Sequence, residues 1–187
     1  MAAAAPEPLV LRQNYSSDTD EAVSVRIRLQ LYAYYVYLSL AAYFDRPEVG
    51  LKHFTSFFLR RSHHWMKCAK KLMWMLNKRG GCTIFDTILK PHRDDWSDGA
   101  QAMEHAFRVE RTVTKSLLDL YEFATKKKDS NLCDFLQCYY LRSQVRVLRE
   151  IAGYLTNLRK IGTLGEDQAQ ALFDKLTLER GDDKDWV

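Results

Sequence analysis

The sequence predicts an all-α protein, a four-helix bundle with one long crossover connection and a short fifth helix near the carboxyl end. Three observations support this fold class. Four long segments repeat apolar residues every three or four positions, the period of a helix that buries one face. Only 8 glycines and 4 prolines occur in 187 residues, too few for a turn-rich sandwich or barrel. No run of about 18 apolar residues is present, so no membrane-spanning segment is expected.

The first two helices are predicted over residues 18–44 and 51–79. Pro47 lies between them and breaks the helical pattern. The pair Gly80–Gly81 directly follows the second segment, and glycine at that place is typical of a helix end. Because the link between the two segments is short, we expect the two helices to run antiparallel.

The third and fourth helices are predicted over residues 97–127 and 131–160, with a short polar break between them. Ser97 or Asp98 is the expected cap of the third helix. The stretch before it, residues 80–96, has no helical pattern and is long enough to run the length of the bundle. This spacing indicates a bundle with one long crossover.

The remaining segments lie at the two ends of the chain. A short fifth helix is predicted over residues 166–176, so that residues 18–178 form one bundle domain. Residues 1–17 are expected to be an amino-terminal extension. Residues 179–187 are rich in aspartate and are expected to be a flexible tail.

The expected location of the protein is the cytoplasm, with presence in the nucleus left open. The amino terminus lacks the basic and apolar regions of a secretory signal. The cysteines form no CxxC pair and have no zinc-type spacing. Free thiols in a reducing compartment are therefore expected. The four cysteines are Cys68, Cys82, Cys133 and Cys138.

The basic character of the chain is concentrated in the second predicted helix. The net charge is +4, and residues 51–79 contain eight lysines or arginines, three histidines and no acid. In the rest of the chain the acids outnumber the bases. A charge run is usually a solvated helix face, but this one would also suit the phosphates of a nucleic acid.

Five polar residues lie on or beside the inward-facing stripes of the predicted helices. They would fit a satisfied polar network in a long core. They would equally fit the remains of a metal site, because helical bundles hold metals with polar side chains from facing helices. The residues alone leave both interpretations open. The five are Gln30, Tyr37, Arg61, Glu110 and Gln144.

Several stretches of the chain, in the same order and over nearly its whole length, resemble the ferritin family, and most of all its heavy-chain type. They include LYAYYVYLSL (31–40), YFDR (43–46), NKRGG (77–81), LCDFL (132–136) and LFDKLTL (172–178). The resemblance implies a ferritin-like four-helix bundle of the iron-storage family. It also implies a homo-oligomer in a shell of the 24-subunit type, or co-assembly with other ferritin subunits.

The resemblance also implies where iron would be oxidised. Heavy-chain ferritins use a glutamate on the first helix, Glu-x-x-His on the second, a glutamate on the third and a glutamine on the fourth, with a supporting tyrosine. In the same order, the matching residues here are Gln30, Trp65, Cys68, Glu110, Gln144 and Tyr37. The ferroxidase centre therefore looks degenerate, with no catalytic set intact and Glu110 as a residual, weak metal ligand. A new metal site built from Cys68 and Glu110 is the alternative.

Two further family sites are altered. Light-chain ferritins collect iron on glutamates of the second helix, and positive charge in their place should repel Fe²⁺. The matching residues here are Arg60, His63, His64 and Lys67. At the three-fold pore of the family, Asp134 keeps one carboxylate and Gln137 replaces the other.

The leading hypothesis is a shell subunit that is not an enzyme. It would fold and assemble as a structural or regulatory subunit, without ferroxidase or mineral-nucleation activity. One alternative is ferroxidase and iron storage through non-standard ligands. Another is a basic module that binds nucleic acid or other anions, which is disfavoured because the basic helix face would lie inside a closed shell. No tightly bound cofactor is expected, although the resemblance is compatible with iron binding.

Glu110 gives the sharpest structural expectation. It lies in the middle of an apolar stripe, so it should be buried, and a buried carboxylate is normally paired, hydrogen-bonded or protonated. We expect its partners to be the amides of Gln30 and Gln144, the hydroxyl of Tyr37 and the guanidinium of Arg61.

Overall fold

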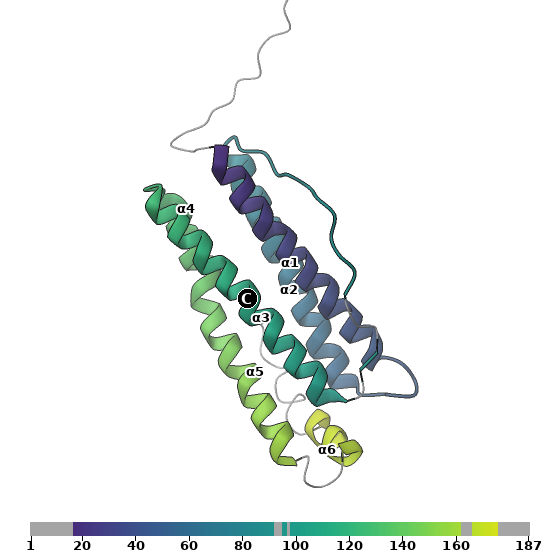
Figure 1. The fold of residues 1–187 in the computed structure, drawn as a ribbon. Coiled ribbons are helices and arrows are strands. Elements are labelled where there is room, and N and C mark those ends of the chain that lie inside the picture. The colour runs from purple at the N-terminus through teal and green to yellow at the C-terminus, as the bar shows by residue number, and fades with distance from the viewer. Residues whose placement is uncertain (1–16, 92–94, 97, 162–165, 176–187) are drawn as a thin grey trace, which may run out of the picture.

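The computed structural model describes residues 17–91, 95–96, 98–161 and 166–175, which form a bundle of helices (Figure 1). Helix α1 (Ser17–Phe44) lies beside α2 (Lys52–Lys78). Helix α3 (Gly99–Lys126) lies beside α5 (Arg142–Ile161). The two pairs meet through α1 and α3. The predicted all-α bundle is confirmed.

The end of α2 is a glycine turn. Gly80 has a φ of 72°, a left-handed conformation that glycine adopts without strain. The backbone N–H of Gly80 donates to the carbonyl of Asn77 at 3.2 Å, and that of Gly81 to the carbonyl of Leu76 at 3.0 Å. These two bonds satisfy carbonyls that the helix end leaves open, so the Gly80–Gly81 pair terminates α2.

The crossover runs along the outside of the α1–α2 pair (Figure 1). Two side chains of α1 hold its beginning. The N–H of Cys82 donates to the carboxylate of Asp20 at 3.2 Å, and the N–H of Ile84 donates to the hydroxyl of Ser24 at 2.9 Å. The long connection is therefore fixed to the bundle by hydrogen bonds rather than by regular secondary structure.

The crossover ends at the cap of α3. Asp98 accepts a hydrogen bond from the N–H of Gln101 at 2.6 Å, so Asp98 caps the helix. The first helical residue, Gly99, is buried against α2. A Cβ atom at Gly99 would lie 2.8 Å from Cζ of the buried Phe54 ring, so a larger residue at this position would force that ring to move.

The fourth helix departs from the sequence prediction because it contains a π-helical turn. Helix α4 (Ser130–Leu136), η1 (Gln137–Leu141) and α5 follow one another without a break. The wider π turn keeps residues that are four positions apart on one side. This spacing holds for the buried residues Leu132, Leu136, Tyr140 and Gln144.

Asp129 joins the start of α4 to the end of α2. Its carboxylate accepts the N–H of Leu132 at 3.1 Å, which caps α4, and pairs with Arg79 at 2.8 Å. Both side chains of this pair are largely buried. The bridge fixes one end of the bundle.

Helix α6 (Glu166–Phe173) closes the opposite end of the bundle. Phe173 is fully buried against Phe54 and Tyr154, with ring centroids 5.6 and 5.8 Å away. The carboxylate of Asp174 accepts the N–H of Phe54 at 2.8 Å. The α-helical part ends at Phe173, and Asp174 and Lys175 continue it with π-helical geometry. Residue 176, residues 1–16 of the predicted extension 1–17 and the predicted tail 179–187 lie outside the described residues, whereas Ser17, predicted in the extension, is the first residue of α1.

Among the described residues, no helix is long and apolar enough to cross a membrane.

Candidate functional site

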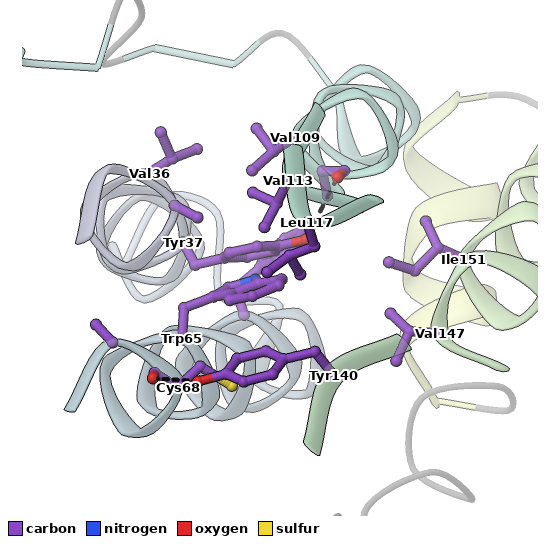
Figure 2. Close-up of a cluster of buried hydrophobic side chains, with 14 of the residues drawn as sticks. Val36, Tyr37, Trp65, Cys68, Val109, Val113, Leu117, Tyr140, Val147 and Ile151 are labelled. Atoms are coloured by element: carbon purple, nitrogen blue, oxygen red, sulfur yellow. Dashed lines mark hydrogen bonds between the residues drawn. The ribbon is translucent and has the colours of Figure 1, made fainter. Parts of the chain in front are cut away.

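The centre of the bundle holds one carboxylate, that of Glu110 on α3, and its side chain is fully buried. Its Oε1 atom accepts hydrogen bonds from three side chains. Arg61 of α2 donates through Nη2 at 2.5 Å and Nε at 3.2 Å. The hydroxyl of Tyr37 on α1 lies at 2.8 Å and the indole Nε1 of Trp65 on α2 at 3.0 Å. Figure 2 shows the Tyr37 and Trp65 rings beside each other in this core.

The second carboxylate oxygen of Glu110, Oε2, accepts its hydrogen bond from the fourth helix. Nε2 of Gln144 on α5 donates to Oε2 at 3.0 Å and also lies 3.2 Å from the hydroxyl of Thr114. Glu110 thus receives five hydrogen bonds from four side chains. These bonds connect α3 to α1, α2 and α5 at a single carboxylate.

Glu110 is buried as expected, and three of its four expected partners are present. The exception is Gln30, whose side chain is fully buried but whose Nε2 and Oε1 atoms have no hydrogen-bond partner. Trp65 is a further donor to Glu110 that was not among the partners expected from the sequence. Its N–H is a donor that needs a partner when buried, and that requirement was the signal available in the sequence.

The electrostatics of the cluster favour the charged forms of Arg61 and Glu110. Burial acts to raise the pKa of Glu110, but the charge of Arg61, together with hydrogen bonds from Arg61, Gln144 and Tyr37, lowers it below its ordinary value. Burial acts to lower the pKa of Arg61, but the charges of Glu110 and Tyr37 and the hydrogen bonds with them together raise it above its ordinary value. Burial, followed by the charge of Glu110, raises the pKa of Tyr37, so its hydroxyl keeps its proton.

This cluster does not fit a metal ion. A metal ligand must offer a lone pair, and Arg61, the indole of Trp65 and the amide nitrogen of Gln144 offer only N–H groups here. They already donate to both oxygens of Glu110, which leaves Oε1 of Gln144, a neutral amide oxygen without a described partner, as the one lone-pair atom that these three side chains offer. One such oxygen is too few to hold a metal ion. Among the described residues, no group of three or more histidine, cysteine, aspartate or glutamate side chains could hold a metal.

The hydrogen-bond contacts of Cys68 are with His64 and Tyr140 rather than with Glu110. Its Sγ lies 3.4 Å from Nε2 of His64, one turn earlier on α2. Burial raises the pKa of the Cys68 thiol to about 12, so it stays protonated near neutral pH. The hydroxyl of Tyr140 donates to the Cys68 carbonyl at 2.7 Å (Figure 2). Cys68 therefore behaves as a buried thiol in a packed core.

The other buried carboxylates of the described chain are engaged elsewhere. Asp20 accepts from the crossover, Asp129 pairs with Arg79, and Asp174 accepts from the start of α2. None of them is bonded to the Glu110 cluster by these contacts. Glu110 is thus the only buried acid of the described residues that lies at the centre of the bundle.

The residues aligned with the nucleation positions follow the outer side of α2. His63 and Lys67 are exposed, whereas Arg60 and His64 are half-buried. Burial, with the charge of Arg61 next in importance, lowers the pKa of His64 to about 3, so its imidazole is neutral near pH 7. His64, contrary to the expectation from the sequence, therefore adds nothing to the positive charge of Arg60 and Lys67 at these positions.

The two pore positions lie on the exposed side of the fourth helix. Asp134 is on α4, and Gln137 is the first residue of η1, about one turn later. The structure does not place them near the Glu110 cluster.

Comparison with known families agrees with this fold. A family model described as the ferritin-like domain matches residues 21–161. That range covers α1 from residue 21 onward and all of α2 to α5, and it includes the whole Glu110 cluster. The chain therefore belongs to the ferritin family, a family of iron-storage proteins whose members form oligomers.

Proposed function

We propose that this chain is a ferritin shell subunit without ferroxidase activity. The proposal rests on one observation above all, that both oxygens of the central carboxylate are occupied by N–H and O–H donors. Oxidation of Fe²⁺ at this place would need ligands with free lone pairs. Glu110 could bind iron only after losing Arg61 as its partner.

Arg61 supplies the positive charge that would otherwise have to come from iron. Arg61 is 4% exposed, and its Nη2 atom lies 2.5 Å from Oε1 of Glu110. A buried carboxylate of this kind is stable only with a counter-charge or several donors. The side chain of Arg61 therefore lets the bundle keep Glu110 without a metal, which supports a structural role for the cluster.

The basic side of α2 supports a second part of the proposal, weak mineral nucleation. Exposed Lys67 and half-buried Arg60 stand where light-chain ferritins carry glutamates. Positive charge lowers the local concentration of Fe²⁺. A shell made only of this subunit should therefore hold less iron than one of light-chain type. The subunit would act as a structural or regulatory member of homo-oligomeric or mixed shells.

The test is a direct assay of iron oxidation. Purified protein is mixed with Fe²⁺ and oxygen, and ferric absorbance and oxygen consumption are followed beside a buffer control and an active heavy-chain ferritin. We expect the rate of the buffer control, and afterwards little iron in shells isolated by sedimentation. A rate clearly above buffer that saturates with protein would instead support ferroxidase through non-standard ligands.

Location and assembly are further parts of the proposal. The described cysteines Cys68, Cys82, Cys133 and Cys138 are all free thiols, and free thiols suit a reducing compartment such as the cytoplasm. Sedimentation of the purified protein, alone and mixed with heavy-chain subunits, measures whether it closes a shell of the 24-subunit type by itself or only with a partner.

A further inference from the structure

The outer side of α2 carries a continuous stripe of basic and aromatic side chains. His63, Lys67, Lys70, Lys71, Trp74 and Lys78 recur at intervals that keep them on one side of a helix. We call these six residues the basic face. It extends over about 22 Å of helix, and residues 51–79, which contain it, include no acid.

The lysines of the basic face are not neutralised within the described chain. Lys67, Lys70, Lys71 and Lys78 form no ion pair with any described residue. Lys67 and Lys71 act on the pKa of His64 as neighbouring positive charges, while the one opposing carboxylate is Glu110. Since Arg61 already pairs with Glu110, the potential along this side of α2 is positive.

Two large aromatic rings are exposed among these charges. Trp74 is 56% exposed, and the Lys78 ammonium lies 3.9 Å from its ring centroid. Tyr139 of η1 is 52% exposed, and the Lys71 ammonium lies 4.9 Å from its ring. Charge alone would attract any polyanion, but exposed rings beside ammonium groups also suit the flat faces of bases.

We propose that the basic face, together with Tyr139, binds single-stranded nucleic acid. The lysines contact successive phosphates, and Trp74 and Tyr139 stack on unpaired bases. A duplex keeps its bases stacked on one another and offers no face to these rings, so a single strand is the better fit. This inference goes beyond the proposed function and does not rest on the loss of ferroxidase activity.

Assembly determines when a strand can reach the basic face. The resemblance to ferritins turns this side of α2 towards the interior of a closed shell. A strand would then bind subunits before closure and be enclosed by assembly. This route meets the objection that a closed shell would keep nucleic acid away from the basic helix face.

The experiment uses a fluorescent oligothymidylate of about 20 nucleotides, long enough for one binding site. Its anisotropy is titrated with the purified protein. A second sample is dissociated, reassembled with the strand and treated with nuclease. We expect binding to unassembled protein or nuclease-protected strand in reassembled shells. With four lysines on phosphates, the logarithm of affinity should fall with the logarithm of salt concentration with a slope of about −3.

Three variants separate phosphate contacts from stacking. Lys67→Ala with Lys71→Ala should reduce the magnitude of the salt slope by about 1.4. Trp74→Ala should weaken binding at least about fivefold at constant salt, whereas Trp74→Phe should keep most of the affinity. Lys115→Ala with Lys126→Ala, on exposed positions of α3, removes the same charge outside the basic face and should change neither quantity.

Two results would overturn the proposal. The first is the absence of both binding in solution and protected strand after reassembly. The second is that duplex DNA or inorganic polyphosphate competes as well as the single strand while Trp74→Ala has no effect. In that case the basic face is a polyanion surface without recognition of bases.

Discussion

Within the described part of the chain, the carboxylate of Glu110 is the one point at which side-chain hydrogen bonds join all four long helices of the bundle. Tyr37 reaches it from α1, Arg61 and Trp65 from α2, and Gln144 from α5. Breaking a buried pair by removing one partner leaves an uncompensated charge, which costs far more than the pair itself contributes. The stability of the bundle should therefore be sensitive to Arg61.

Replacing Arg61 by methionine should lower the free energy of unfolding by about 3–5 kcal/mol. The reason is that Glu110 would remain buried without its counter-charge. Chemical denaturation measures the change. Arg108→Met is the matched control, because Arg108 pairs with Glu104 on an exposed surface and such pairs contribute about 0–1 kcal/mol. Equal effects of the two substitutions would contradict a stabilising role for the buried pair.

His64 should make stability depend on pH. Its pKa is about 3 in the folded chain and about 6.5 when exposed. Between these values the unfolded chain binds a proton that the folded chain does not, so stability is full above about pH 6.5 and falls as the pH drops towards 3. Glu110 adds a loss of the same sign at lower pH, because its folded pKa is also lowered.

The measurement is the free energy of unfolding at several pH values between 7 and 4. His64→Gln should flatten this dependence. The exposed neighbour substitution His63→Gln serves as the control. If the free energy of unfolding of His64→Gln depends on pH as strongly as that of the unsubstituted protein, the imidazole binds its proton at the same pH in the folded and the unfolded chain.

The buried amide of Gln30 should lower the stability of the folded chain. Both polar atoms of its buried amide lack a partner, and an unsatisfied buried group of this kind costs about 1–3 kcal/mol. Gln30→Leu, of similar volume, should therefore raise the midpoint of thermal unfolding. Gln144→Leu removes an amide that is bonded to Glu110 and should lower it. A loss of stability in Gln30→Leu would mean that water satisfies the amide.

At the scale of the elements, the contact between α2 and α3 depends on the absence of a side chain at Gly99. A Cβ atom there would lie 2.8 Å from Phe54, which itself stacks on Phe44. We expect Gly99→Ala to cost about 1–3 kcal/mol by overpacking. Gly153→Ala should stabilise α5 by about 0.5–1 kcal/mol, because nothing lies within 4 Å of its Cβ position. Denaturation of the two variants side by side compares these opposite signs.

The helices could be predicted because each repeats apolar residues every three or four positions, but the contacts between the helices could not be predicted in this way. Arg61 was recognised as a partner of Glu110 because a charged residue interrupts an apolar stripe. Gln30 lies on a stripe too, yet its amide finds no partner, since the distance between facing helices is not encoded in one helix. The periodic pattern therefore reveals which side chains are inward but not which of them meet.

The π turn in the fourth helix was missed for a related reason. The π turn leaves a signal in the sequence, because the buried residues Leu132, Leu136, Tyr140 and Gln144 follow one another at intervals of four. A regular α-helix would rotate such a series gradually out of the core, since its period is 3.6. One extra residue in η1 corrects the rotation. A prediction of one uniform α-helix over residues 131–160 does not include this extra residue.

At the scale of the whole molecule, restoring iron oxidation should require more than the lost ligands. The triple substitution Gln30→Glu, Trp65→Glu and Cys68→His supplies the family's ligand types but leaves Arg61 bound to Glu110. We expect this variant to stay inactive. Adding Arg61→Gln should release Glu110 and produce measurable oxidation of Fe²⁺ by oxygen.

Stopped-flow absorbance compares the triple and quadruple variants, and circular dichroism establishes that both are folded. If the triple variant alone is active, Arg61 is not what keeps iron from the carboxylate. If the folded quadruple variant is inert, the block lies outside the cluster, for example at the pore positions Asp134 and Gln137.

The Arg61–Glu110 pair also constrains how this sequence can change over evolutionary time. Losing either residue first leaves the other as an unpaired buried charge, so single-step intermediates are selected against through poor folding, whatever their chemistry. The two positions should therefore change together or not at all. A lineage in which the Arg61 guanidinium had replaced a metal ion beside Glu110 could not regain the metal site by single substitutions, even if iron oxidation became advantageous again.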